Sequence, residues 1–218
     1  VCGSLTRACC HASWCSRGTH KNKSHNAVAD VLCEMWTALG GGAASDHKSM
    51  VVNGRVSGAN ACELPNNARV DVVLFGAGEA GQDSYIDVSI SCVECHSSFE
   101  TAIQAKEKDK HDMYKNEVEK LPNCQFLPFV IGSAGGFGSC ARQVWDLLKT
   151  HAKKVQGRDW RHARSSRSFC TQWRQSLSVR LMRHTSESMI KRALPVTYLR
   201  ALALEVDADG EHAKFREF

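Results

Sequence analysis

The amino-acid sequence predicts an α/β fold in which helices flank a small mixed sheet. Apolar and polar residues alternate over 69–75 and again over 84–91, which is the pattern of half-buried strands. Apolar residues recur every three or four positions over 25–39, 98–121 and 139–154, which is the pattern of amphipathic helices. Helices and strands therefore follow one another along the chain in an order that is typical of an α/β domain.

The composition is that of a globular protein. The chain has 218 residues, of which 43% are hydrophobic and 23% charged, and this excludes collagen-like and wholly disordered proteins. No apolar run approaches the ~20 residues of a membrane-spanning helix, so we expect no membrane partner. The sequence opens without the pattern of a secretory signal, and its 11 cysteines are odd in number. We therefore expect an intracellular protein with free thiols, some of them candidate metal ligands.

Composition and charge divide the chain into three parts. Residues 1–25 are rich in Cys and His, residues 26–154 carry the α/β core, and residues 155–218 form a basic helical extension with a frayed tail. Between 153 and 200 the chain has twelve Lys and Arg against two acids. An excess of this size indicates a polyanion as partner, and a solvated basic helix is the alternative.

The first elements are predicted from residues that begin and end them. Ser24 stands where an N-cap would precede the helix over 25–39, and the run Gly40-Gly41-Gly42 ends that helix. Residues 43–66 are rich in Gly, Asn and Ser, so we expect loops there with one short strand near 50–52.

A β-hairpin comes next. Its strands over 69–75 and 84–91 are separated by a glycine-rich turn at 76–81. The alternation places one apolar face on each strand, made of Val70, Val72 and Leu74 on the first and of Ile86, Val88 and Ile90 on the second. Asp71 and Asp87 lie on the opposite faces.

The remaining elements follow in the second half of the chain. They are a helix from about Ser98 to Leu121, a buried strand over 124–131, a turn over 133–138, a helix over 139–154 and a basic helix over 166–194. In the last of these Phe169, Trp173, Leu177 and Leu181 recur at every fourth position, so this helix also has an apolar side.

The two hairpin aspartates are the first candidates for chemistry. If the hairpin pairs in an even register, Asp71 and Asp87 share a face, roughly 5–6 Å apart. Two carboxylates at that distance repel each other unless a cation lies between them, and Mg²⁺ prefers such oxygen ligands. The alternative for either residue alone is an ordinary surface or strand-end aspartate.

Two lysines interrupt the apolar stripe of the helix that follows the hairpin. Lys106 and Lys110 share a helical face with Ile103 and Tyr114, whereas Lys108 lies on the outer face. A lysine at the edge of an apolar face can simply extend its ammonium into water. The functional interpretation is that one of the two points at the aspartates, since two acids, a metal and a lysine can hydrolyse a phosphodiester.

These residues resemble a known family. The strings Arg69-Val-Asp71-Val-Val-Leu, Ile86-Asp87-Val-Ser and Ala105-Lys-Glu-Lys-Asp-Lys110-His-Asp-Met-Tyr114 resemble the restriction-like, PD-(D/E)XK-type endonuclease domain at the C-terminus of site-specific non-LTR retrotransposon polyproteins. The resemblance covers roughly residues 9–150 and extends to Phe126-Leu-Pro-Phe-Val and Gly135-Gly-Phe-Gly. Val70 replaces a proline of the family pattern, and Met113 separates Tyr114 from the lysine expected beside it.

The resemblance implies a restriction-endonuclease-like fold and assigns roles to particular residues. Asp71 and Asp87 would hold Mg²⁺ or Mn²⁺, and Lys110, or else Lys106, would contact the scissile phosphate. An acidic residue shortly before the first aspartate can join the site in that family, and Glu63 stands in the corresponding place.

The same family carries a zinc knuckle upstream of the nuclease core, followed by a His-Asn helix start. The sequence matches it in degenerate form, because His11-Ala-Ser-Trp-Cys15 and His25-Asn26 resemble its last parts but no clean C-x-x-C precedes them. The candidate ligands for Zn²⁺ are Cys9, Cys10, His11, Cys15 and His25.

The function implied by the resemblance is a metal-dependent endonuclease domain that acts in the nucleus and nicks target DNA for retrotransposon insertion. Its partners would be DNA, the element RNA and a reverse transcriptase upstream in the same polyprotein. We expect the basic extension to bind nucleic acid through Arg161, Arg164, Arg167, Arg174, Arg180 and Arg183. The alternative is a catalytically inactive nucleic-acid-binding fragment of such a polyprotein.

Overall fold

A four-stranded mixed sheet with helices on both faces forms the centre of the protein. The computed structural model describes residues 20–47, 50–52, 55–57, 59–91, 98–133, 135–156 and 166–193. The sheet has the strand order β1-β4-β5-β6, and a separate two-stranded sheet pairs β2 with β3. The predicted α/β class with a small mixed sheet is therefore confirmed.

The elements follow the chain in this order: α2 (His20–Ala38), β1 (Gly42–Ser45), β2 (Met50–Val52), β3 (Arg55–Ser57), η1 (Ala59–Cys62), β4 (Val72–Phe75), η2 (Glu79–Gly81), β5 (Asp83–Ser91), α3 (Phe99–Val118), β6 (Cys124–Gly132), α4 (Ser139–Gln156) and α5 (Ser166–Ala193). The last three predicted helices and the strand between them all occur, with ends that shift by a few residues. Within the described chain no helix is long and apolar enough to cross a bilayer.

Helix α2 begins earlier than predicted. It starts at His20, so Ser24 lies inside the helix, buried at 3% exposure, and the prediction of Ser24 as the N-cap is wrong. The helix ends where expected, because Gly40 adopts a φ of 83°, which glycine tolerates without a steric penalty. The indole of Trp36 then donates a hydrogen bond to the carbonyl of Phe75 at 3.2 Å and ties the helix to β4.

Strand β1 was not predicted. Its residues, Gly42 to Ser45, are small and do not alternate, so the segment is not distinguishable from a loop by pattern alone. The structure pairs β1 antiparallel to β4, with Ala43 opposite Leu74. The short strand predicted at 50–52 is confirmed as β2, and its partner β3 was missed.

The predicted hairpin is present as β4 and β5. The two strands pair antiparallel with Val72 opposite Ile86 and Leu74 opposite Ser84. Val70 departs from the prediction, because the chain bends at Asp71 and β4 begins only at Val72. Val70 therefore packs beneath the other face of the sheet rather than beside Val72 and Leu74.

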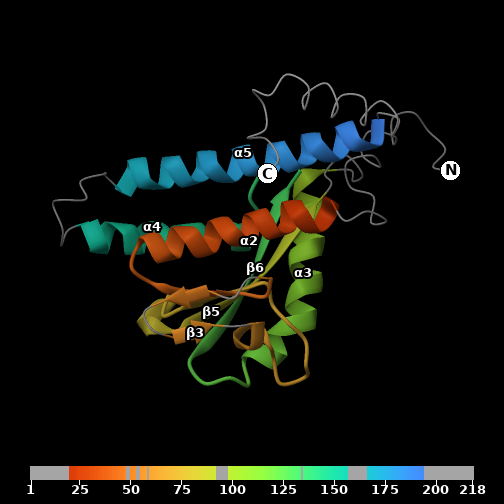
Figure 1. Ribbon diagram of the computed structural model, residues 1–218. Helices are drawn as coiled ribbons and strands as arrows, with labels where there is room; N and C mark the ends of the chain where they lie inside the picture. Colours follow the sequence, from red (N-terminus) through yellow and green to blue (C-terminus); the bar gives the residue numbers. More distant parts are fainter. Residues whose placement is uncertain are drawn as a thin grey trace.

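Strand β6 lies parallel to β5 over the whole length of both strands. Parallel neighbours need a long crossover, and α3 supplies it. The hydroxyl of Ser98 caps α3 by accepting a hydrogen bond from the backbone N–H of Thr101 at 3.2 Å. The crossover helix is thus fixed at its start and lies across β5 and β6 (Figure 1).

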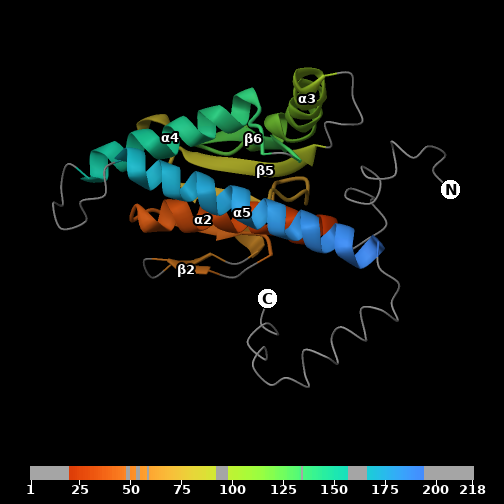
Figure 2. The same ribbon diagram turned by 90° about the horizontal axis from the view of Figure 1, so that it is seen from above.

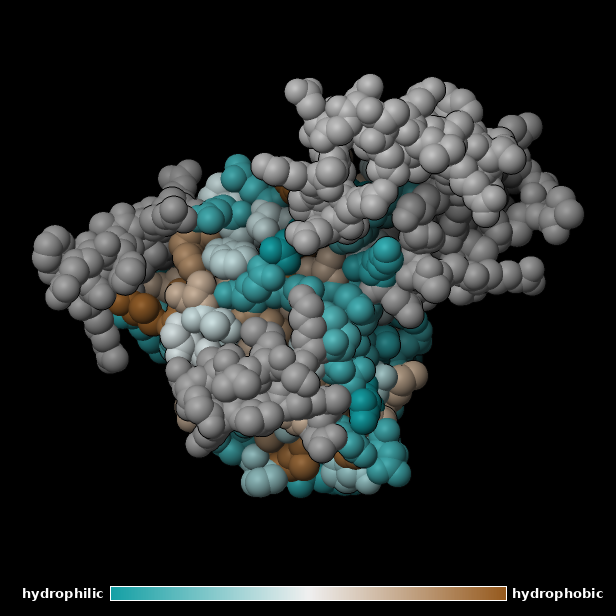
Figure 3. Space-filling view, viewed as in Figure 1, coloured by the Kyte–Doolittle hydropathy of each residue, from teal (hydrophilic) through white to brown (hydrophobic). Residues whose placement is uncertain are grey.

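The sheet has a hydrophobic core on each face. The larger core lies between the sheet and α2, α4 and α5, and it contains Trp36, Phe129, Leu148, Leu177 and Leu181. The smaller core lies beneath α3 and η1. Helix α5 lies over the seam between α2 and α4, as Figure 2 shows, so the basic helix is part of the packed structure. The described surface in Figure 3 is mainly hydrophilic.

Candidate active site

Asp71 lies where the hairpin ladder ends, next to the strand that carries Asp87. The ladder ends at the pair of Val72 and Ile86, and Asp71 is the residue that precedes β4. The backbone N–H of Asp71 donates to the carbonyl of Ile86 at 3.1 Å, and the N–H of Val88 donates to Oδ2 of Asp71 at 2.6 Å. The even register predicted for the hairpin is confirmed at Val72 and Ile86, and the backbone of β5 holds Asp71 just beyond that pair. That the two carboxylates share a face stays a prediction.

Asp87 is buried beneath α3 and forms an ion pair with Lys110. The residue is 3% exposed, and Nζ of Lys110 lies 2.8 Å from its Oδ2. Lys110 thus supplies the positive charge nearest to this buried carboxylate among the described residues. Burial raises the pKa of Asp87 and the charge of Asp71 raises it further, while Lys110 acts in the opposite direction.

Lys110 is positioned by two neighbours on its own side of the sheet. Its ammonium pairs with Asp87 and lies 5.4 Å from the centre of the Tyr114 ring. Burial, together with the charge of Asp87, raises the pKa of Tyr114 to about 12, so its hydroxyl stays protonated at neutral pH. Asp71, Asp87 and Lys110 therefore come together from the end of one strand, the middle of another and a crossover helix.

Lys106, the other candidate lysine, does not reach the aspartates. Its side chain is 42% exposed, and its Nζ lies 3.9 Å from Oδ2 of Asp109. Lys108 is exposed as predicted. Of the lysines that the sequence offered, the structure brings only Lys110 to the carboxylates.

Glu107, which sequence reasoning missed, takes the buried position on α3 expected for Lys106. Its Oε2 accepts from the hydroxyl of Ser139 at 2.6 Å, and its Oε1 accepts from the N–H of Cys140 at 2.8 Å. A carboxylate at the start of a helix is favoured by the unpaired N–H groups there. Positions three and four residues after Ile103 both fit an amphipathic stripe, so periodicity could not decide between Lys106 and Glu107.

His25 joins the site through Asp71. Its Nε2 lies 3.0 Å from Oδ2 of Asp71, and its Nδ1 lies 3.2 Å from Oδ1 of Asn26. Both partners are oxygens, so a ring that carries a proton on each nitrogen satisfies both contacts. Burial lowers the pKa of His25, but the hydrogen bond to Asp71 and the charge of that residue outweigh burial and raise it overall.

The contacts of His25 bear on its predicted role as a zinc ligand. Both ring nitrogens are engaged by described residues, so a zinc ion would have to displace one of these contacts. The other candidate zinc ligands, Cys9, Cys10, His11 and Cys15, lie outside the described residues. Zinc binding at the N-terminus stays a prediction.

Glu63 lies away from the aspartates. It pairs with Arg69 in an isolated antiparallel bridge, and its Oε2 lies 3.8 Å from Nη2 of that arginine. Arg69 also donates to Asp46 at 3.0 Å. Glu63 has no contact with Asp71 or Asp87 in the described part of the chain.

The predicted nucleic-acid-binding arginines have different surroundings. Arg161 and Arg164 lie outside the described residues, and Arg167 falls in the first turn of α5. Arg180 makes two contacts with Glu34, at 3.0 and 2.6 Å, so it fastens α5 to α2. Arg183 pairs with Glu187 one turn further along the same helix. Arg174 instead lies over the ring of Phe137, 5.2 Å from its centre.

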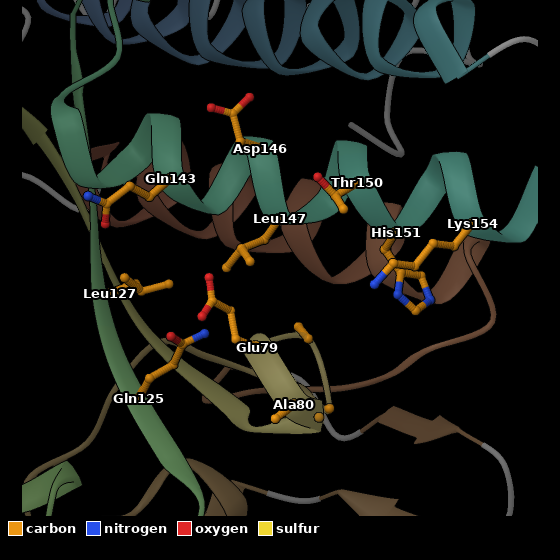
Figure 4. A pocket seen from close by; sticks show the side chains of 14 residues that line it. Glu79, Ala80, Gln125, Leu127, Gln143, Asp146, Leu147, Thr150, His151 and Lys154 are labelled. Atoms are coloured by element: carbon orange, nitrogen blue, oxygen red, sulfur yellow. The ribbon is translucent and has the colours of Figure 1, made fainter.

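A hollow of about 830 Å³ lies at the other end of the hairpin (Figure 4). It is lined by the turn between β4 and β5 and by α4, with Glu79, Gln125, Asp146 and His151 among its side chains. Asp71 precedes β4, whereas the hollow lies after it. The hollow is therefore separate from the candidate active site.

The site offers two carboxylates and an ammonium rather than a full metal cage. Within the described ranges no three His, Cys, Asp or Glu side chains are grouped so as to hold a metal ion. Mg²⁺ is commonly held by one or two carboxylates, with water and substrate phosphate completing its shell. No family model matches the sequence, and no curated protein matches it.

Proposed function

We propose that this chain is a metal-dependent endonuclease domain of the restriction-like type, which hydrolyses a phosphodiester bond in DNA. The observation that carries the proposal is the ion pair of 2.8 Å between Lys110 and Asp87, with Asp71 bound to the N–H of Val88, the residue after Asp87. A buried acid, a second acid nearby and a lysine supply the groups that phosphodiester hydrolysis needs. The mixed sheet with a crossover helix supports this fold type.

The two aspartates fit a hard divalent cation such as Mg²⁺ or Mn²⁺. The carboxylate of Asp87 is buried, and its negative charge forms an ion pair with Lys110 alone among the described residues, so a second cation beside Asp71 and Asp87 is favoured. The raised pKa of Asp87 reflects burial and then repulsion from Asp71, and a cation beside both would relieve the repulsion. The atoms that Asp71 and Asp87 offer to a metal are carboxylate oxygens, which Mg²⁺ prefers.

The mechanism assigns a task to each residue. Asp71 and Asp87 would hold the metal, which when bound would lower the pKa of water and stabilise negative charge. Lys110 places its ammonium where charge develops on the phosphate, and a compact cation in a water-poor site is effective there. His25 and the N–H of Val88 both contact Oδ2 of Asp71, and so they fix the direction in which this carboxylate points.

The biological setting of the proposal is retrotransposition. The motifs around Asp71, Asp87 and Lys110 support a domain that nicks target DNA in the nucleus, beside a reverse transcriptase in the same polyprotein. DNA would be the substrate, and the element RNA a further partner.

The test is nicking of supercoiled plasmid by the purified chain. We expect conversion to the open circle in Mg²⁺ or Mn²⁺ and none in EDTA. The double variant Asp71→Asn, Asp87→Asn should be inactive, which excludes a contaminating nuclease, whereas Asp112→Asn, which changes an exposed acid of α3, should be active. Absence of nicking in either metal, with plasmid still bound, would favour the inactive nucleic-acid-binding fragment.

A further inference from the structure

A basic groove runs between α4 and α5. It has a volume of about 510 Å³ and receives four cationic side chains, Arg142, Lys149, Lys153 and Arg174, against one acid, Asp146. Phe137, Trp145 and Cys170 form apolar parts of its wall. We call it the α4–α5 groove. Figure 2 shows the two helices that border it running side by side.

The four cations of the groove are not neutralised by the described part of the chain. None of them forms an ion pair with a described residue, whereas Arg180 and Arg183, further along α5, are both paired with glutamates. Lys149 and Lys153 are one helical turn apart, and like charges at that spacing repel each other. Cations gathered in this way between two helices favour an anion from outside the chain.

Phe137 holds two of the cations in place. Its carbonyl accepts a hydrogen bond from Nε of Arg142 at 3.2 Å, and its ring lies beneath the guanidinium of Arg174 at 5.2 Å. A side chain that is already fixed loses less conformational entropy when it binds a ligand. The two arginines are thus prepared to bind an anion.

The spacing of the cations fits an extended ligand rather than a single anion. Arg142, Lys149 and Lys153 lie on one face of α4 at intervals of seven and four residues. Eleven residues of helix span about 16 Å. Along one strand of a duplex, phosphates advance by ~3.4 Å each, so this length corresponds to about five phosphates.

The groove is also mechanically linked to the candidate active site. Helix α4 begins at Ser139, where Glu107 accepts hydrogen bonds from the hydroxyl of Ser139 and the N–H of Cys140, and Glu107 is three residues before Lys110 on α3. A ligand in the groove would therefore be bound by α4. The start of α4 is fixed to Glu107 of α3, one turn before Lys110.

We propose that the α4–α5 groove binds the phosphate backbone of DNA and so positions the substrate for the candidate active site. This proposal rests on the proposed function, since it names the surface by which the endonuclease would hold its substrate. The contacts are to phosphate, because Phe137 and Trp145 are buried at 7% and 8% exposure and leave no ring for a base to stack on.

The test is a salt titration of duplex DNA binding, in EDTA so that no cleavage occurs. The triple variant Lys149→Gln, Lys153→Gln, Arg174→Gln should flatten the slope of log affinity against log salt by about 0.9 for each phosphate that it no longer neutralises. The control triple Lys108→Gln, Lys115→Gln, Lys154→Gln removes the same charge from residues outside the groove and should keep the slope. The single variants Lys153→Gln and Lys154→Gln give a further comparison between neighbours on one helix.

The outcomes separate this proposal from the proposed function. If the salt slope is flattened in the triple variant of the groove but not in the control triple, the α4–α5 groove is the DNA-binding surface, whether or not the wild-type chain nicks plasmid. Equal slopes in the two triples would overturn the groove as the DNA-binding surface, even if nicking is observed. Thermal unfolding of each variant verifies that it is folded, and the substituted side chains are exposed, so we expect all to fold.

Discussion

Nε2 of His25, near the start of α2, lies 3.0 Å from Oδ2 of Asp71, 46 residues later in the chain. This contact ties the first described helix to the hairpin and orients one of the two proposed metal ligands. The folded protein raises the pKa of His25, so the charged ring is favoured beside the carboxylate. The contact can be tested through its effect on stability.

The first prediction is that His25→Gln destabilises the metal-free protein more at low pH than at high pH. A histidine whose pKa is raised by folding contributes its full stabilisation below about 6.5, and this stabilisation disappears as pH rises through the folded value. We expect the free energy of unfolding to fall by about 1.5 kcal/mol at pH 5.5 and by much less at pH 9. Urea denaturation at both pH values measures this, and an equal decrease at both would mean that the ring is not charged in the fold.

The second prediction distinguishes the three lysines of α3. Lys110→Ala should lower the nicking rate by on the order of 10²-fold, since it removes the cation next to Asp87. Lys106→Ala and Lys108→Ala should retain the wild-type rate within about twofold, because both side chains are in contact with solvent and neither reaches the aspartates. Lys110→Arg should recover only part of the activity, since a planar fork replaces a compact ammonium. Equal rates for the Lys108 and Lys110 variants would remove Lys110 from the site.

The third prediction concerns Glu107, which fastens α4 to α3. Glu107→Ala should lower the free energy of unfolding by about 2–3 kcal/mol, because it removes two charge-assisted hydrogen bonds at the start of α4. Glu107→Gln keeps an acceptor and should cost less. Urea denaturation of both variants checks this, with Glu100→Ala in the exposed first turn of α3 as the control. A decrease no larger than that of the control would show that α4 is not held by this carboxylate.

The fourth prediction concerns the junction between α2 and β1. A Cβ on Gly41 would overlap the indole of Trp36, which is itself buried, so Gly41→Ala should destabilise the protein by about 1–3 kcal/mol. A Cβ on the next residue, Gly42, would make only an ordinary contact with Phe75 at 3.4 Å. Gly42→Ala should therefore have the smaller effect on the melting temperature. The reverse order would contradict the packing of Trp36 against Gly41.

The sequence predicts those parts of the site that depend on local pattern. Alternation in the two hairpin strands predicts the register that pairs Val72 with Ile86, because the side chains of a strand repeat every two residues. It does not extend to Asp71, where the chain bends before β4 begins. The helical stripe of α3 leads to Lys106 and Lys110 alike, and the structure distinguishes them. Strand β1 could not be predicted, because Gly42 to Ser45 lack a pattern and form a strand only through pairing with β4.

Other parts of the site depend on contacts between distant segments. No local pattern relates His25 to Asp71, since the contact exists only when α2 packs against the hairpin. The buried carboxylate of Glu107 is stabilised by hydrogen bonds from Ser139 and Cys140, which lie on another helix. A buried carboxylate needs such partners, and a sequence read one segment at a time does not show them.

The central claim is that Asp71 and Asp87 form the catalytic centre of a metal-dependent nuclease, and single-turnover nicking by the two single variants tests it most directly. Asp71→Asn and Asp87→Asn should each lower the rate in Mg²⁺ by at least about 10²-fold, the scale of losing one charged group from a reacting centre. Their affinity for DNA in EDTA should be unchanged or higher, because a negative charge near phosphate is removed. If either variant, correctly folded, nicks DNA at the wild-type rate, the two-aspartate site is contradicted.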